Sequence, residues 1–177
     1  MILGGSMSVR RSGAVAALLV AAVMLSGCAS SLSTLLGGAG RDENGQIESG
    51  GDLDVFTITV GDCFFDDALA AATGEEQTST VRAVPCDEKH AFEAYHDFAL
   101  PEGDYPTMDA IDEAAADECL PAFDEYIGVS YEDSKYDFSY YSPSRETWEY
   151  RDDRLVSCVL TAPEGETLTG SLKGVGE

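Results

Sequence analysis

Apolar residues follow three different patterns along this chain. Residues 12–24 form a run dominated by Ala, Val and Leu and free of charge, whereas residues 29–51 are rich in Ser, Gly, Asp and Glu without a sustained apolar period. From residue 53 onward, short apolar segments alternate with polar ones. The pattern predicts a leader over residues 1–27, a flexible tether over 28–52, one folded domain over 53–174 and a frayed tail over 175–177.

Several stretches of the domain show the β-branched, aromatic or alternating character of β-strands. They are residues 55–60, 63–65, 80–86, 91–100, 131–141 and 154–162, and residues 147–150 lead into the last of them. In the fourth stretch, strict alternation places Phe92 and Phe98 on one face and Glu93 and Tyr95 on the other, as in a half-buried strand. Residues 66–79 are polar and Ala-rich, which predicts a surface loop with one weak helical turn.

Residues 107–127 carry the clearest helical pattern in the chain. Thr107 can act as the N-cap, and acidic residues follow in the first turns, where the positive end of a helix favours them. Apolar positions recur at steps of three and four, namely Met108, Ile111, Ala115, Cys119, Phe123 and Tyr126. Pro121 predicts a kink or a split, and Gly128 fits the stop. The fold class is therefore α+β, a small antiparallel sheet with this helix packed on one face.

Charge narrows the classes of partner. The chain has 33 acidic and 10 basic residues, a net charge of -23. Loss of residues 1–27 would remove Arg10 and Arg11 and leave a net charge of -25. Because no basic patch exists, we expect no nucleic-acid partner. The acidity could attract a basic partner, but a generally soluble, self-repelling surface is the simpler interpretation.

The start of the chain predicts export and anchoring. Arg10 and Arg11 precede an apolar run that is shorter than the about 20 residues a membrane-spanning helix needs, as in a secretory signal peptide. The following Leu25-Ser26-Gly27-Cys28 resembles the bacterial lipobox. That resemblance implies cleavage before Cys28 and a diacylglycerol thioether on its sulfur, with fatty acyl chains such as palmitate. Two acyl chains, at about 0.8 kcal/mol per methylene, would hold the domain on the extracytoplasmic face of the cell membrane. The alternative is an ordinary signal peptide with an incidental Cys28.

Four cysteines remain once Cys28 is assigned to lipid. In an exported protein, an even number of widely spaced cysteines predicts two disulfides, and four cysteines allow three connectivities. We favour Cys63 with Cys86, which would close a local strand pair, and Cys119 with Cys158, which would tie the helix to a later strand. Each would contribute about 3 to 4 kcal/mol. Without a Cys-x-x-Cys motif, neither a zinc site nor a thioredoxin-like site is expected.

Short motifs across residues 55–174 follow one another in a distinctive order. They are Gly61-Asp62-Cys63-Phe64, then Val84-Pro85-Cys86 with His90 and Glu93, then Cys119 with Phe123 and Tyr126, then Trp148 with Asp153-Arg154-Leu155-Val156-Ser157-Cys158, then Thr169-Gly170-Ser171-Leu172-Lys173-Gly174. This order resembles the septum formation domain family of actinobacterial exported and membrane-anchored proteins. The resemblance implies a cell-envelope domain nominally linked to septum formation, without an established enzymatic activity. Asp152 stands where that family usually carries a Gly, and one extra residue follows Trp148.

No residue pattern predicts catalysis, a metal or a cofactor. His90 and His96 would lie about 20 Å apart on an extended strand, too far to share one ion. His90 is interpreted as a turn residue that bonds to backbone beside a disulfide, because no Ser or free Cys nucleophile with a supporting motif is visible. The aromatic residues Trp148, Tyr140, Tyr141 and Tyr150 are interpreted as core and sheet packing, with a sugar-binding platform as the alternative. Asp153 and Arg154 join His90 and Trp148 as functional or structural candidates.

The expected function is that of a lipid-anchored, non-catalytic envelope domain that binds a protein or a cell-wall component and is linked to cell division. The alternative is an enzyme or ligand-binding lipoprotein that acts on a small molecule derived from the wall. A deep pocket that holds His90 with an acid or hydroxyl partner would favour the alternative. A flat aromatic face, with His90 tied to backbone, would favour the first.

Overall fold

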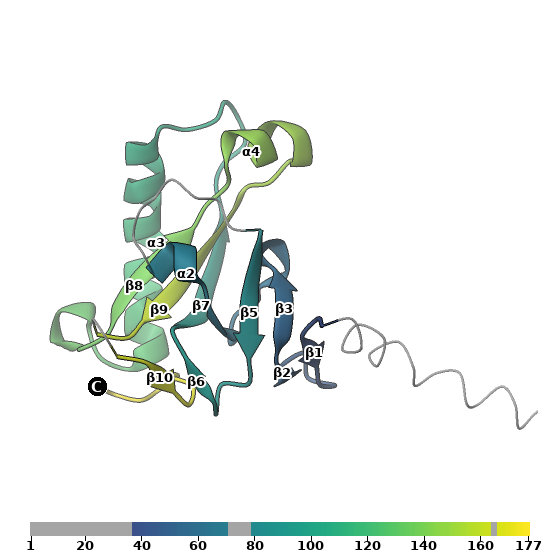
Figure 1. Cartoon of the computed structure of the whole chain (residues 1–177). Coiled ribbons are helices and arrows are strands. Elements are labelled where there is room, and N and C mark those ends of the chain that lie inside the picture. Colours follow the sequence, from purple (N-terminus) through teal and green to yellow (C-terminus); the bar gives the residue numbers. More distant parts are fainter. Residues whose placement is uncertain (1–36, 71–78, 164–165) are drawn as a thin grey trace, which may run out of the picture.

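The computed structural model describes residues 37–70, 79–163 and 166–177. Its centre is a six-stranded sheet in the order β3-β5-β4-β7-β9-β8, and each neighbouring pair is antiparallel. The strands are β3 (Gly51–Asp54), β4 (Cys63–Phe65), β5 (Thr80–Val84), β7 (Phe92–Ala99), β8 (Asp137–Tyr141) and β9 (Leu155–Thr161). The short helix α2 (Asp67–Ala70) lies in front of this sheet and the long helix α3 behind it (Figure 1). The predicted α+β class is confirmed.

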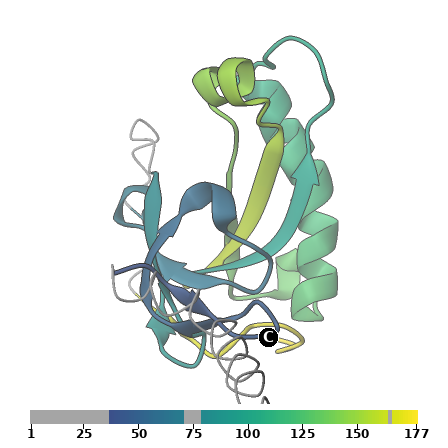
Figure 2. The same ribbon diagram turned by 90° about the vertical axis from the view of Figure 1, so that its right-hand side faces the viewer.

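Helix α3 (Met108–Ile127) covers one face of the sheet (Figure 2). The Thr107 hydroxyl accepts a hydrogen bond from the Ala110 N–H, and Gly128 ends the helix in the left-handed conformation with φ 94°. The predicted split at Pro121 is wrong, because the helix runs through this position. Met108 also departs from the expected apolar stripe, since it lies in the first turn and is exposed.

Both predicted disulfides are present. Cys63 pairs with Cys86 and Cys119 with Cys158, with Cα–Cα distances of 5.2 and 5.8 Å. The second bond joins α3 to β9 inside the core cluster under the helix, where Tyr95, Phe123 and Leu160 also pack. A second cluster on the other face of the sheet includes Phe64, Phe92 and Val159. Both faces of the central strands are therefore buried.

Burial on both faces explains why strict alternation failed for residues 91–100. The register between β7 and β9 shifts between Ala94 and His96, which places an extra residue on β7. Glu93 and Tyr95, expected on the opposite and exposed face of a half-buried strand, are both buried. His90 belongs to a separate short strand, β6 (Lys89–His90).

Three other segments differ from their predicted structure. Val55–Thr57 forms a 3-10 helix, η1, because Asp54 caps it by accepting from the Phe56 N–H at 3.0 Å. Tyr131–Asp133 forms a second 3-10 helix, η2, so the strand expected over residues 131–141 begins only at residue 137. Residues 147–150, expected to lead into a strand, lie in α4 (Arg145–Arg151), which Ser144 starts with a capping box.

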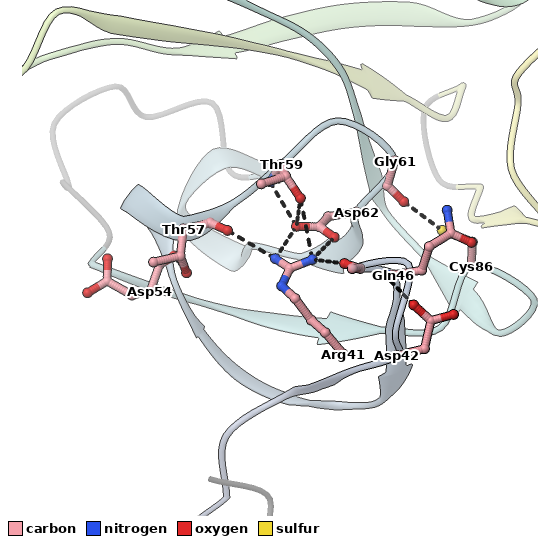
Figure 3. A network of polar contacts seen from close by, with 10 residues as sticks. Arg41, Asp42, Gln46, Asp54, Thr57, Thr59, Gly61, Asp62 and Cys86 are labelled. Atoms are coloured by element: carbon pink, nitrogen blue, oxygen red, sulfur yellow. Dashed lines mark hydrogen bonds and ion pairs between the residues drawn. The ribbon is translucent and has the colours of Figure 1, made fainter. Parts of the chain in front are cut away.

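Residues 40–49 form a hairpin and not the predicted tether. Strand β1 (Gly40–Arg41) pairs with β2 (Ile47–Ser49), and Ile47 is buried. The Arg41 guanidinium donates to both carboxylate oxygens of Asp62, at 2.7 and 2.6 Å, and to the carbonyl oxygens of Gly45 and Thr57 (Figure 3). The folded domain therefore includes residues before 53.

The end of the chain is held against the domain. Strand β10 (Leu168–Thr169) pairs with β6. Beyond it, the N–H groups of Gly174 and Gly176 donate to the carbonyl oxygens of Tyr126 and Ile127 at 2.7 and 2.9 Å, at the end of α3. Lys135 forms an ion pair with Glu177. The frayed tail predicted for residues 175–177 is therefore wrong, because the end of α3 supplies backbone acceptors.

Candidate binding groove

A groove with a volume of about 500 Å³ runs beside the edge strand β8. Phe138 and Tyr140 pack against the cluster under α3, so the alternate residues Ser139 and Tyr141 project from the opposite face. The groove is lined by residues of η1, α2, β8, β9 and the start of α4, together with Tyr105 and Met108. It therefore lies where the edge of the sheet meets three short helical segments.

The groove combines apolar, hydroxyl and acidic groups. Its exposed apolar side chains are Phe56, Met108 and Leu155, with exposed fractions of 45, 55 and 41%, and these are three of the six large apolar residues exposed in the described chain. Its hydroxyl-bearing residues are Tyr105, Ser139, Tyr140, Tyr141, Ser142, Ser144, Thr147 and Ser157. Asp66 and Asp153 are the charged residues in the described lining. Such a mixture suits a ligand with apolar, hydrogen-bonding and positively charged parts.

Asp66 and Tyr141 form a fixed polar pair in the wall of the groove. The Tyr141 hydroxyl donates to Asp66 Oδ2 at 2.7 Å. Asp66 Oδ1 accepts from the N–H groups of Ala68 and Leu69, at 2.9 and 3.2 Å, which caps α2. Burial, together with the hydrogen bond to Asp66, raises the pKa of Tyr141 well above its ordinary value. The phenol therefore stays neutral and holds Asp66 in one orientation.

Two other tyrosines of the groove are also held in place. The Tyr105 hydroxyl donates to the Pro143 carbonyl at 3.1 Å, and the Tyr140 hydroxyl donates to Asp112 on α3. Burial and the Asp112 hydrogen bond raise the pKa of Tyr140. Because these rings are fixed before any ligand arrives, binding costs little side-chain entropy.

The predicted candidates Trp148, Asp153 and Arg154 lie together at the end of α4, where Asp153 lines the groove and the other two do not. Trp148 is buried, and its indole N–H donates to the Gly103 carbonyl at 3.1 Å. The Arg154 guanidinium lies 3.8 Å from the centre of the Trp148 ring and donates to the Trp148 carbonyl. Asp153 accepts from the Leu155 N–H at 3.1 Å. Trp148 is thus enclosed in the core and is not an exposed sugar platform.

Asp152 makes the turn that connects α4 to β9. It is the C-cap of α4 and adopts the left-handed conformation with φ 55° and ψ 31°. Among the described residues other than glycine, no other has a positive φ. The turn is therefore made with Asp in a conformation that favours Gly.

His90 and Glu93 belong to a separate buried cluster beside the Cys63–Cys86 disulfide. Glu93 accepts from the Tyr126 hydroxyl at 2.9 Å, from the Ser171 hydroxyl, and from the Leu172 N–H at 2.7 Å. His90 Nδ1 donates to the Glu88 carbonyl at 2.9 Å, and burial lowers the pKa of the ring. His90 does not line the groove. His96 lies elsewhere, with Nε2 4.0 Å from Glu118 of α3.

Sequence reasoning missed most of the groove. Phe56, Asp66 and Tyr105 are far apart in the chain and were not singled out as site residues. Tyr141 was considered only with Trp148, as part of a sugar-binding platform. The hydroxyl-rich segment Ser139–Ser144 was visible as Ser-Tyr-Tyr-Ser-Pro-Ser but carries no known motif. Cys28, the predicted lipidation site, lies outside the described residues. No helix in the described part of the chain combines the length and the apolar character needed to cross a membrane.

Comparison with known families gives one match. A family model described as "Septum formation" matches residues 60–175, more than half of the chain. The match covers all of the groove except its η1 wall and leaves the hairpin of β1 and β2 outside. Neither curated proteins nor solved structures give a match.

Proposed function

We propose that this chain, which belongs to the septum formation family, is a lipid-anchored binding domain on the extracytoplasmic face of the cell membrane, and that the groove beside β8 holds its partner. The partner would be an extended, positively charged segment of a protein that acts in septum formation. The observation that carries the proposal is the concentration of exposed apolar side chains in a groove whose described charged residues are both acidic.

The chemistry of the groove favours an extended polypeptide. Strand β8 pairs with β9 on one side and forms the edge of the described sheet. An edge strand offers unpaired backbone groups to an added strand, and pockets beside it select alternate side chains. Phe56, Met108 and Leu155 offer apolar contacts, while the net charge of -23 attracts Lys and Arg.

The enzyme alternative has no supporting observation in this groove. Its described lining contains neither His nor Cys. Asp66 accepts hydrogen bonds from Tyr141 and neighbouring backbone, and Asp153 accepts one from the Leu155 N–H. General acid-base or nucleophilic chemistry would need a group that is free to exchange protons with a substrate. Binding needs only the fixed surface that is present.

The anchor would keep the groove close to the membrane. If Cys28 carries the lipid, twelve residue steps separate it from Gly40, the first residue of β1. A chain of that length reaches at most about 40 Å, whatever its conformation. The partner would therefore be met at the base of the cell wall.

The groove can be tested by introducing positive charge at exposed positions. We would replace Met108 and Leu155 with Lys in the full chain, fuse a proximity-labelling enzyme, and compare the labelled envelope proteins in dividing cells. Tyr150→Lys is the matched control, because Tyr150 is an exposed aromatic outside the groove. We expect the double variant to lose enrichment of division proteins and the control to keep it. Equal enrichment in all three chains, or labels spread evenly along the envelope, would refute the proposal.

The anchor needs a separate experiment. Cells would be fed a fatty acid analogue, and the labelled chain compared with its Cys28→Ser variant. We expect label on the native chain alone and release of the variant into the medium. Unchanged membrane association of Cys28→Ser would show that lipid on this residue does not hold the protein.

A further inference from the structure

Outside the groove, we propose that reduction of the Cys63–Cys86 disulfide converts the cluster of Cys63, Cys86, His90 and Glu93 into a binding site for zinc. One ligand atom from each of Cys63, His90 and Glu93 lies within 4.8 Å of the others, and all three residues are buried. Cys86 Sγ is bonded to Cys63 Sγ and therefore lies next to these three ligand atoms. The cluster combines two sulfurs, one nitrogen and one carboxylate.

The independent sign of a ligand is the ring of His90. Its Nδ1 donates to the Glu88 carbonyl, so Nε2 carries the free lone pair. Nε2 is fully buried and has no hydrogen-bond partner. A buried polar atom without a partner is costly in a folded protein. Metal-bound histidines usually donate their other N–H to a carbonyl or carboxylate, which is the bond that Glu88 provides.

Hydrogen bonds also hold the Glu93 carboxylate in a fixed position, from which it could bind zinc. Three donors fix its carboxylate: Oε1 accepts from the Tyr126 and Ser171 hydroxyls and Oε2 from the Leu172 N–H, so Oε2 keeps one free lone pair. Tetrahedral zinc with bond lengths near 2.0 to 2.3 Å places its ligands about 3.5 Å apart, so the three groups need to approach one another by at most about 1 Å. Breaking the disulfide frees both sulfurs to make that movement.

The oxidation state of Cys63 and Cys86 decides whether the proposed zinc site exists. In the disulfide, neither sulfur is a thiolate, and zinc lacks two of its four ligands. Two equivalents of a low-molecular-weight thiol, RSH, would reduce the bond. One thiolate attacks a sulfur to form a mixed disulfide, and the second releases RSSR. The two electrons and two protons end on Cys63 and Cys86 as thiols. Zinc then displaces both protons and binds the thiolates.

The two disulfides differ in their access to a reductant. Cys119 and Cys158 are both fully buried between α3 and β9, whereas Cys86 is partly exposed. A thiol in solution therefore reaches the Cys63–Cys86 bond first. Mild reduction would open the proposed site and leave the core disulfide intact.

The test uses the exported full chain with Cys28→Ser, which removes the fifth thiol. The protein is reduced anaerobically with a thiol, desalted, and titrated with zinc against a chromophoric chelator. Mass spectrometry after alkylation establishes which disulfide has opened. We expect one zinc per reduced chain and none per oxidised chain. Cobalt should give the charge-transfer absorption of a thiolate complex.

Variants separate this site from chance thiol binding. His90→Gln should weaken zinc binding more than about tenfold, since loss of even an outer-shell partner costs 10 to 100-fold. His96→Gln is the matched control, because His96 lies outside the cluster. In the native sequence, bound zinc should also slow alkylation of Cys63 and Cys86, a readout that needs no substitution. Absence of zinc binding after reduction, or equal binding by His90→Gln, would overturn the proposal.

Discussion

Arg41 and Asp62 form a bidentate ion pair between residues 21 positions apart, and this pair fastens the N-terminal hairpin to the loop before β4. Asp62 is only 2% exposed, and it also accepts from the N–H and hydroxyl of Thr59. The hydrogen bonds to Asp62 raise the pKa of Arg41, so the guanidinium stays charged. The hairpin lies outside the residues matched by the family model, yet its anchor point lies inside them.

Replacing Arg41 with Ala should lower the free energy of unfolding by about 3 kcal/mol, because the buried Asp62 carboxylate would lose its partner. Arg41→Lys should recover only part of this loss, since one ammonium cannot make the forked contact. Urea denaturation followed by circular dichroism measures both. Arg145→Ala is the control: its pair with Glu149 is exposed and worth less than about 0.5 kcal/mol. Equal losses of unfolding free energy for Arg41→Ala and Arg145→Ala would show that the Arg41–Asp62 pair does not stabilise the domain.

Asp152→Gly should stabilise the domain by about 0.5 to 1 kcal/mol, because Gly adopts the left-handed C-cap conformation without the Cβ penalty. Asp152→Ala keeps the Cβ and should give no such gain. Both remove the exposed contact of Asp152 with Arg154, so their difference isolates the backbone effect. Thermal unfolding of the three chains is the measurement. A lower stability for the Gly variant than for the Ala variant would show that the turn does not need this conformation.

Glu93→Gln should release the end of the chain. The Gln amide keeps one oxygen acceptor, but its NH2 group would point at donors that now bind a carboxylate oxygen. A change of this kind in a buried hydrogen-bond network lowers the free energy of unfolding by about 2 to 4 kcal/mol. Hydrogen exchange should show faster exchange of the Leu172 and Gly174 amides, with little change in β8. Tyr126→Phe removes one donor only and should have a smaller effect. Unchanged protection at Leu172 would mean that Glu93 does not hold this segment.

Stability should fall above about pH 10. Burial raises the pKa of Tyr95, Tyr126 and Tyr141 above the ordinary value near 10. These phenols ionise at lower pH in the unfolded chain than in the folded one, so the folded state binds more protons in this range. The free energy of unfolding therefore falls as the pH rises. Tyr141→Phe should reduce this loss by about 1.4 kcal/mol per pH unit at most. Unfolding curves between pH 8 and 11 would measure the slope, and an unchanged slope would count against the raised pKa.

The helix and the disulfides could be predicted because their signals are local or limited in number. Thr107, the apolar stripe and Gly128 mark α3 within one segment, and local capping needs no distant partner. Of the three possible cysteine pairings, the favoured one would close a local strand pair and tie the helix to a later strand, and both of its bonds are present. The order of the short motifs that resembles the family was likewise visible in the sequence.

The structure differs from the prediction where tertiary contacts favour another conformation or burial than the local sequence does. Val55 and Phe56 have strand propensity, but the Asp54 cap and the turn toward Gly61 favour η1. Glu93 looked exposed by parity, but α3 and the returning C-terminal segment bury it, through Tyr126 and the Leu172 N–H. Local propensity amounts to at most about 1 kcal/mol, which such contacts exceed.

Acidity, the helix, the cysteine inventory and the order of the family motifs can be read from composition, spacing and capping, because each depends on neighbours in the chain. The groove and the buried cluster cannot. Phe56, Tyr105 and Tyr141 converge only after β8 has paired with β9, and Cys63 meets Glu93 only after β4 has paired with β7. Their chemistry depends on distances between segments that the chain order does not encode locally.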